Sequence, residues 1–129
     1  MKKIVSILLT LACLVSLAAC TAKPNDSVSG VSGKDDRVSV NKAYSTLPGY
    51  LVVHQLDNNQ PGKIIGLSKL YPLGSISQVT IATADKLQTG TSYAVVLHHD
   101  NSDLKFIASQ DLPAKNKKGQ IIMATFKAK

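Results

Sequence analysis

The fold class of this chain is decided by the stretch Pro48-Gly49-Tyr50-Leu51-Val52-Val53-His54-Gln55-Leu56-Asp57-Asn58-Asn59. Its centre, residues 50–56, contains the aromatic and β-branched side chains that fit the pleated surface of a sheet. Proline, glycine, aspartate and asparagine flank this centre, and these residues favour tight turns. The stretch therefore predicts one short β-strand with a turn at each end.

Comparable runs recur along the chain at intervals of roughly 10–15 residues, a spacing that suits an antiparallel sandwich or barrel. Glutamate favours helices, and the chain contains none. It is instead rich in Val, Ile, Thr and Ser, and β-branched residues favour strands. We predict an all-β antiparallel sandwich of about seven strands, with one plausible helical turn at residues 83–87. The predicted strands are 37–40, 50–56, 63–67, 75–83, 91–99, 104–107 and 120–127.

The alternation of side chains along these runs indicates which residues form the core. In the run 75–83, Ile76 falls on one face, whereas Val79 and Ile81 fall on the other. The side chains expected to fill the interior are Leu51, Val53, Val79, Ile81, Val95, Leu97, Ile122 and Phe126.

The amino terminus has the order of a bacterial secretory signal peptide. A basic head, Met1-Lys2-Lys3, precedes an almost uninterrupted apolar run, and small residues follow that run. The apolar segment is about 16 residues long, which is shorter than the roughly 20 that a helix needs to cross a hydrocarbon core. We therefore expect residues 1–19 to be a cleaved signal peptide rather than a transmembrane anchor.

The ending Leu17-Ala18-Ala19-Cys20 resembles the lipobox of bacterial lipoproteins. The resemblance implies that Cys20 becomes the first mature residue and carries acyl chains such as palmitate. Two or more chains give stable anchoring to a membrane without spanning it. Because Thr21 rather than Asp follows Cys20, the resemblance also implies sorting to the outer membrane, at its periplasmic or outer surface, if the organism has two membranes.

Residues 21–35 combine Ser, Gly, Pro, Asn and Asp with little to bury. We therefore expect the lipidated Cys20 and a flexible tether to precede a single folded domain, residues 36–129. Removal of the signal lowers the net charge from +7 to +5, because two lysines leave with it. The expected domain contains no cysteine, so it has no disulfide and its stability depends on packing.

Short motifs rich in glycine, leucine and histidine stand at residues 49–54 (GYLVVH), 66–74 (GLSKLYPLG) and 97–100 (LHHD), followed by Asp103, Phe106 and Asp111-Leu112-Pro113. These motifs resemble a family of cupredoxin-like β-sandwich domains of unknown function, which is common in haloarchaeal surface proteins and occurs in exported bacterial ones. The resemblance covers roughly residues 36–126 and implies a Greek-key topology of the cupredoxin kind. It implies no activity, because the family has none to carry over.

A cupredoxin-like fold raises the question of copper. A blue-copper site needs two His and a Cys thiolate, usually with a weak axial Met. The expected domain has no cysteine, and Met123 is its only methionine. A type 1 copper site is therefore excluded unless a partner supplies the thiolate.

A site for copper or zinc without a thiolate stays open, with His54, His98 and His99 as candidate ligands and Asp100 or Asp103 as oxygen donors. Because adjacent side chains of a strand point to opposite faces, His98 and His99 cannot hold one ion together unless a bulge or a strand end intervenes. The plainer interpretation, which we favour, packs one histidine at the edge of the sandwich, hydrogen-bonded to the following loop. It leaves the other histidine exposed.

Two other motifs have simple structural interpretations. The sequence Asp100-Asn101-Ser102-Asp103 predicts a turn between two strands rather than a calcium loop, which needs oxygens at alternate positions and a terminal Glu. Ser68 is not a nucleophile of the Gly-x-Ser-x-Gly type, because Leu70 stands where the second glycine is required.

Lys115, Lys117 and Lys118 form a basic loop that could contact anionic lipid head groups, a cell-wall polymer or an envelope protein. Equally, the lysines could form a solvated loop that blocks strand pairing at a sheet edge. Nucleic acid is not expected as a partner of an exported chain with few aromatic residues.

With no arranged nucleophile or acid–base pair in the sequence, we expect a non-catalytic, membrane-anchored binding or structural module of the cell envelope. The alternative is a metal carrier or small redox protein that uses the histidines and aspartates named above.

Overall fold

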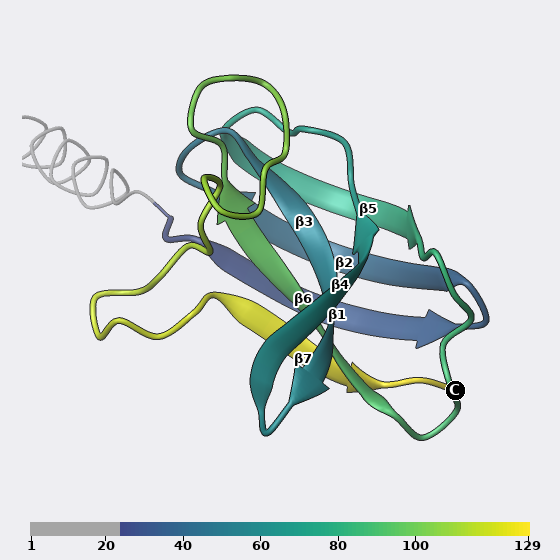
Figure 1. The fold of residues 1–129 in the computed structure, drawn as a ribbon. Coiled ribbons are helices and arrows are strands. Elements are labelled where there is room, and N and C mark those ends of the chain that lie inside the picture. The colour runs from purple at the N-terminus through teal and green to yellow at the C-terminus, as the bar shows by residue number, and fades with distance from the viewer. Residues whose placement is uncertain (1–23) are drawn as a thin grey trace, which may run out of the picture.

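Seven strands form two antiparallel sheets in residues 24–129, the part of the chain that the computed structural model describes (Figure 1). The first sheet, in the order β1-β2-β5, contains β1 (Ser27–Lys34), β2 (Arg37–Ser45) and β5 (Gly74–Ala82). The second, in the order β4-β3-β6-β7, contains β3 (Gly49–Asp57), β4 (Gln60–Leu67), β6 (Ser92–His99) and β7 (Met123–Lys127). No helix occurs in this region, and hence none long and apolar enough to cross a membrane. The predicted all-β antiparallel sandwich is confirmed.

The hydrophobic interior contains residues of both sheets. Every side chain predicted to fill it packs there: Ile122 is partly buried against the core, and the others are buried. Regular alternation explains this in β3 and β6, where residues two positions apart face the same side. These two strands pair along their whole length, from Gly49 opposite His99 to Gln55 opposite Tyr93.

The predicted face of Ile76 in β5 is wrong. Ile76 is only 4 % exposed and packs in the same core as Val79 and Ile81. Between them Gln78 has a φ of 54°, which shifts the alternation of the strand by one residue. The neighbouring strand β2 shifts at the same row, where the Nε2 of Gln78 donates to the Oδ1 of Asn41 at 2.9 Å.

Strand β1 corrects the expected tether. Residues 27–34, which we expected to be linker, form an antiparallel ladder with β2. Only Val28 and Val31 of this strand pack against the core with apolar side chains, so its sequence pattern is weak and its strand form depends on β2. The folded domain therefore begins before residue 36. The expected signal peptide and Cys20 lie outside the described residues.

Two predicted elements are not found. The connection from β6 to β7, residues 100–122, contains isolated bridges but no strand, so the predicted strand 104–107 is wrong. Ser102 and Leu104 have φ values of 78° and 62°, which interrupt an extended backbone. Residues 83–87 form a bend and no helical turn.

Hydrogen bonds join the two sheets at both edges. At one edge Thr83, directly after β5, makes a bridge with Gly66 of β4. At the other edge the N–H of Lys129, after β7, donates to the carbonyl oxygen of Gly33 in β1 at 3.0 Å. The outermost strands of each sheet are thus joined to the opposite sheet.

Candidate functional site

A second buried cluster lies on the outer face of β3 and β6, opposite the main core. Tyr50, His54 and His98 alternate with core residues and therefore point away from the interior, yet all three are buried. For Tyr50 and His98 the reason is Phe106 in the connection 100–122. Its ring packs edge-on against Tyr50 at 5.3 Å and against His98 at 5.5 Å between centroids. The connection thus covers this face.

Two histidines meet beneath this cover. The Nε2 atoms of His54 and His98 are 3.2 Å apart, and their rings are inclined by only 7°. His54 pairs with Ala94 and His98 pairs with Tyr50, so the rings extend toward each other along the strands. Their centroids are 5.4 Å apart, which is longer than the Nε2 separation by about two ring radii. The two nitrogens therefore point at each other.

Backbone carbonyls determine which nitrogen of each ring carries a proton. The Nδ1 of His54 donates to the carbonyl oxygen of Gly62 at 2.8 Å, and the Nδ1 of His98 donates to that of Asp111 at 2.6 Å. A carbonyl oxygen can only accept, so each Nδ1 must carry a hydrogen. In the neutral ring the proton is then absent from Nε2, and two Nε2 lone pairs face each other.

Burial also favours the neutral form of both histidines. Loss of solvent lowers the pKa of both His54 and His98, and the hydrogen bonds to the carbonyls of Gly62 and Asp111 oppose this effect. The pKa of His98 is lowered further by the nearby His54. Two unprotonated Nε2 atoms in contact repel each other unless a positive ion stands between them. A proton on one Nε2, or a metal ion between the two atoms, would remove this repulsion.

His99 does not belong to the pair. It follows His98 in the strand and points to the opposite face, where its Nε2 lies 3.2 Å from a carboxylate oxygen of Asp26. The expectation that His98 and His99 cannot share an ion agrees with this geometry. His54 and His98 meet, whereas the third candidate ligand lies elsewhere.

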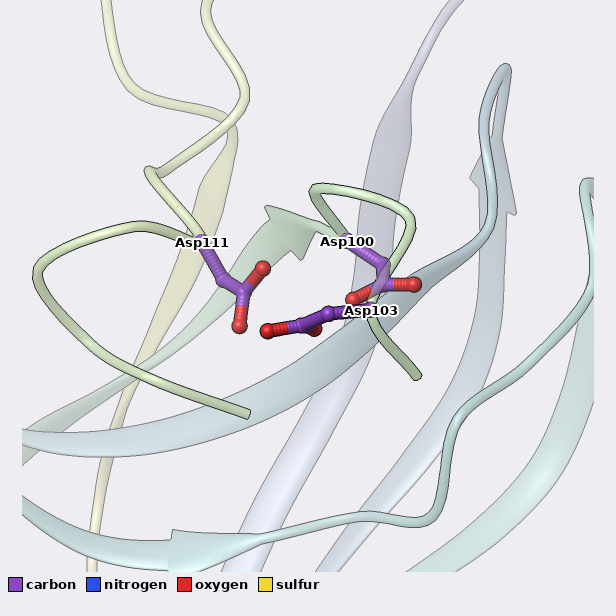
Figure 2. Close-up of side chains that lie close together, drawn as sticks. All are labelled: Asp100, Asp103 and Asp111. Atoms are coloured by element: carbon purple, nitrogen blue, oxygen red, sulfur yellow. The ribbon is translucent and has the colours of Figure 1, made fainter. Parts of the chain in front are cut away.

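Asp100, Asp103 and Asp111 gather in the connection after β6 (Figure 2). One oxygen of each lies within 4.8 Å of the others, and no histidine joins this group among residues 24–129. The sequence predicted one site that combines histidine with Asp100 or Asp103. In the structure the histidine pair and the aspartates instead form two separate groups. Asp103 is exposed, Asp100 is half-buried and Asp111 is fully buried.

The buried Asp111 has a structural role in this loop. Its Oδ1 accepts the N–H of Asn101 at 2.8 Å, and its Oδ2 accepts the N–H of Ile107 at 2.7 Å. One carboxylate thus joins the two ends of the segment that carries Phe106. The carbonyl of the same residue holds His98. Asp111 therefore positions both the cover and one histidine of the pair.

Tyr50 has a buried hydroxyl with no hydrogen-bond partner in the described residues. Its pKa is raised, first by burial and then by the charges of Asp100, Asp111 and Asp103. Burial and these charges thus favour the neutral form of the tyrosine.

The three predicted surface lysines stand together. Lys115, Lys117 and Lys118 are exposed and line a groove of about 520 Å³, whose other side is formed by Asn25 and Asp26 directly before β1. The groove is separate from the histidine pair and contains none of its residues.

Sequence reasoning did not assign Tyr50, Phe106 or Asp111 to the site. Phe106 and Asp111 had a sequence signal, because both fit the last portion of the family pattern described above. The covering role of Phe106 follows only from the fold, which lays the connection 100–122 over β3 and β6.

Comparison with known proteins gives a family for this chain. A family model described as a domain of unknown function (DUF7282) matches residues 25–129. The match includes β1 and so agrees with a domain that begins before residue 36. No curated protein and no solved structure matches the chain.

Proposed function

The chain belongs to this family of unknown function, and we propose that it is an exported lipoprotein whose domain binds one copper or zinc ion through His54 and His98. The observation that carries the proposal is the 3.2 Å contact between two buried Nε2 atoms whose Nδ1 partners leave them unprotonated. From the sequence we expected a non-catalytic binding or structural module first and a metal-binding protein second. Because His54 and His98 converge, we now place metal binding first.

The distance supports a shared ion. Zinc binds histidine nitrogen at about 2.0–2.1 Å, and two ligands of one tetrahedral ion are then about 3.3 Å apart. The separation of the Nε2 atoms of His54 and His98 is 3.2 Å. Metal-binding histidines also donate their other N–H to a carbonyl or carboxylate, which fixes the ring. Both histidines of the pair have such a partner.

One further residue favours copper over zinc. His54 and His98 lie on either side of the row of paired residues in which Val52 of β3 faces Val96 of β6. Met123 of β7 stands opposite Val96 in this row, and directly paired residues share a face of the sheet. A thioether is a soft ligand that selects copper(I). We therefore expect copper(I) to bind more tightly than zinc.

Metal content measured on untagged protein tests the proposal. After incubation with copper(I) or zinc and removal of the free metal, elemental analysis is expected to find one equivalent per chain. His54→Asn and His98→Asn each keep a donor for the backbone carbonyl but lack an Nε2 atom. Each is expected to weaken binding by more than the 10–100-fold that loss of an outer-shell partner costs.

The third histidine supplies the matched control. His99→Asn removes an imidazole one position from the pair, on the opposite face, and is expected to leave metal binding unchanged. Met123→Leu is expected to weaken copper(I) and not zinc. If untagged protein retains neither metal, or if the variant that lacks both His54 and His98 binds as tightly as the original chain, the pair holds only a shared proton and the proposal is wrong.

Export and anchoring are supported by the sequence of residues 1–20 alone. We propose that Cys20 is acylated and that the domain is held at a membrane of the cell envelope. Mass spectrometry of the mature amino terminus tests this directly. Acyl chains on Cys20 are the expected result, and an unmodified thiol or a retained signal peptide would contradict it.

A further inference from the structure

The lysine loop and the start of the folded domain lie at the same end of the sandwich. β1 and β7 belong to different sheets but both run toward the end of the sandwich where Gly33 meets Lys129. β6 is antiparallel to β7, so β1 begins at the end where β6 ends and β7 begins. In Figure 1 the beginning of β1 and the loop before β7 are both on the left. Asn25 and Asp26 even share the groove lined by Lys115, Lys117 and Lys118.

The chain between the lipid and this groove is short. Cys20 precedes Asn25 by five positions, and five residues span at most about 18 Å when fully extended. The expected tether of residues 21–35 would have allowed a much larger distance, but β1 uses residues 27–34. An acylated Cys20 would therefore hold the groove beside the lysine loop within about 18 Å of the membrane surface, the reach of residues 20–25.

The loop is also built to present its charges. Asn116 holds it, since its Oδ1 accepts the N–H groups of Lys118 and Gln120 at 2.9 Å each. The nearest acidic group of the groove, Asp26, is already engaged by the N–H and hydroxyl of Thr46. The three lysines are therefore exposed on a hydrogen-bonded turn at the end of the domain where β1 begins.

We propose that Lys115, Lys117 and Lys118 bind the anionic head groups of the membrane that holds Cys20. This inference rests on the proposed acylation of Cys20. A lysine near an anionic membrane surface contributes an attraction that corresponds to about a fivefold gain in affinity, so three together give on the order of 100-fold. The domain is then held in one orientation, with its lysine end against the bilayer.

Lysine labelling of the full lipoprotein tests the inference. The protein is reconstituted into vesicles of phosphatidylcholine alone or with phosphatidylglycerol, treated briefly with an amine-reactive reagent and analysed by mass spectrometry. Labelling of the three loop lysines is expected to slow on the order of tenfold on the anionic vesicles and to recover in high salt. Lys34, Lys127 and Lys129 lie at the opposite end of the sandwich, which is about 25 Å away along β1, and are expected to label equally on both.

Two variants with equal charge changes complete the test. Lys115→Gln with Lys118→Gln is expected to abolish the protection of Lys117, whereas Lys34→Gln with Lys127→Gln is expected to preserve it. Equal labelling of Lys117 on both kinds of vesicle, with the protein retained on each, overturns the docking inference and leaves the anchor intact. Failure of the protein to stay on phosphatidylcholine vesicles overturns the anchor itself, and the inference falls with it.

Discussion

His54 and His98 are held by the carbonyls of Gly62 and Asp111, and this determines where each ring carries its proton. The sequence identified both histidines as candidates and separated His98 from His99. It could not predict their contact, because that contact depends on a four-residue offset across the β3–β6 ladder and on rings that lie along the strands.

The lowered pKa values of these histidines predict how the metal-free protein responds to acid. In the folded state both remain neutral below the ordinary value of about 6.5. The unfolded chain then binds more protons than the folded one, so stability is present above pH 6.5 and is lost as the pH falls below it. We expect the free energy of unfolding, measured with a chelator present, to decrease between pH 7 and pH 5.

Variants assign this dependence to the pair. A chain with both His54→Asn and His98→Asn is expected to lose much of the decrease, whereas His99→Asn is expected to retain it. Urea denaturation at several pH values measures all three. An unchanged pH dependence in the double variant would show that other groups cause it.

At the scale of elements, strands with regular alternation were predicted well and the others were not. β3 and β6 follow a period of two throughout, and their inward residues were assigned correctly. β5 was predicted as a strand, but the positive φ of Gln78 shifts the alternation. Ile76, which precedes Gln78, therefore faces the core rather than the opposite side. β1 was missed because Val28 and Val31 are its only apolar core contacts. β1 is a strand because it pairs with β2, and the local sequence pattern does not reveal this pairing.

The connection 100–122 depends on Asp111, and Asp111→Asn tests this. The substitution puts an amide nitrogen where a backbone N–H needs an acceptor, so one buried donor loses its partner. We expect a loss of about 2 kcal/mol in stability, within the range for an unsatisfied buried group beside a lost charged hydrogen bond. Metal affinity is expected to fall as well, since the same residue holds His98.

Asp103→Asn is the matched control, because Asp103 lies in the same aspartate group but is exposed. Its stability is expected to change by less than about 0.5 kcal/mol, as is usual for surface substitutions. Equal effects of the two substitutions, measured by urea denaturation, would mean that the group acts through its total charge rather than through the two hydrogen bonds of Asp111.

For the whole molecule, the described residues contain no cysteine, so every strand must contribute through pairing and packing. Deletion of residues 24–34 removes β1 and leaves β2 as an uncovered edge. We expect the shortened chain to fail to fold, in contrast to a chain that carries Lys23→Ser and Pro24→Ser before an intact β1. Circular dichroism and thermal unfolding compare the two. A cooperative transition at the original temperature after the deletion would show that β1 is dispensable.

The bonds that join the sheets, between Thr83 and Gly66 and between Lys129 and Gly33, have a consequence for molecules packed closely together. An uncovered outer strand offers its backbone to a second chain and can start aggregation. Here the backbone groups at these positions are already used within one molecule. If the chain is anchored as we propose, crowded copies would therefore find fewer free backbone groups for strand pairing at these two positions.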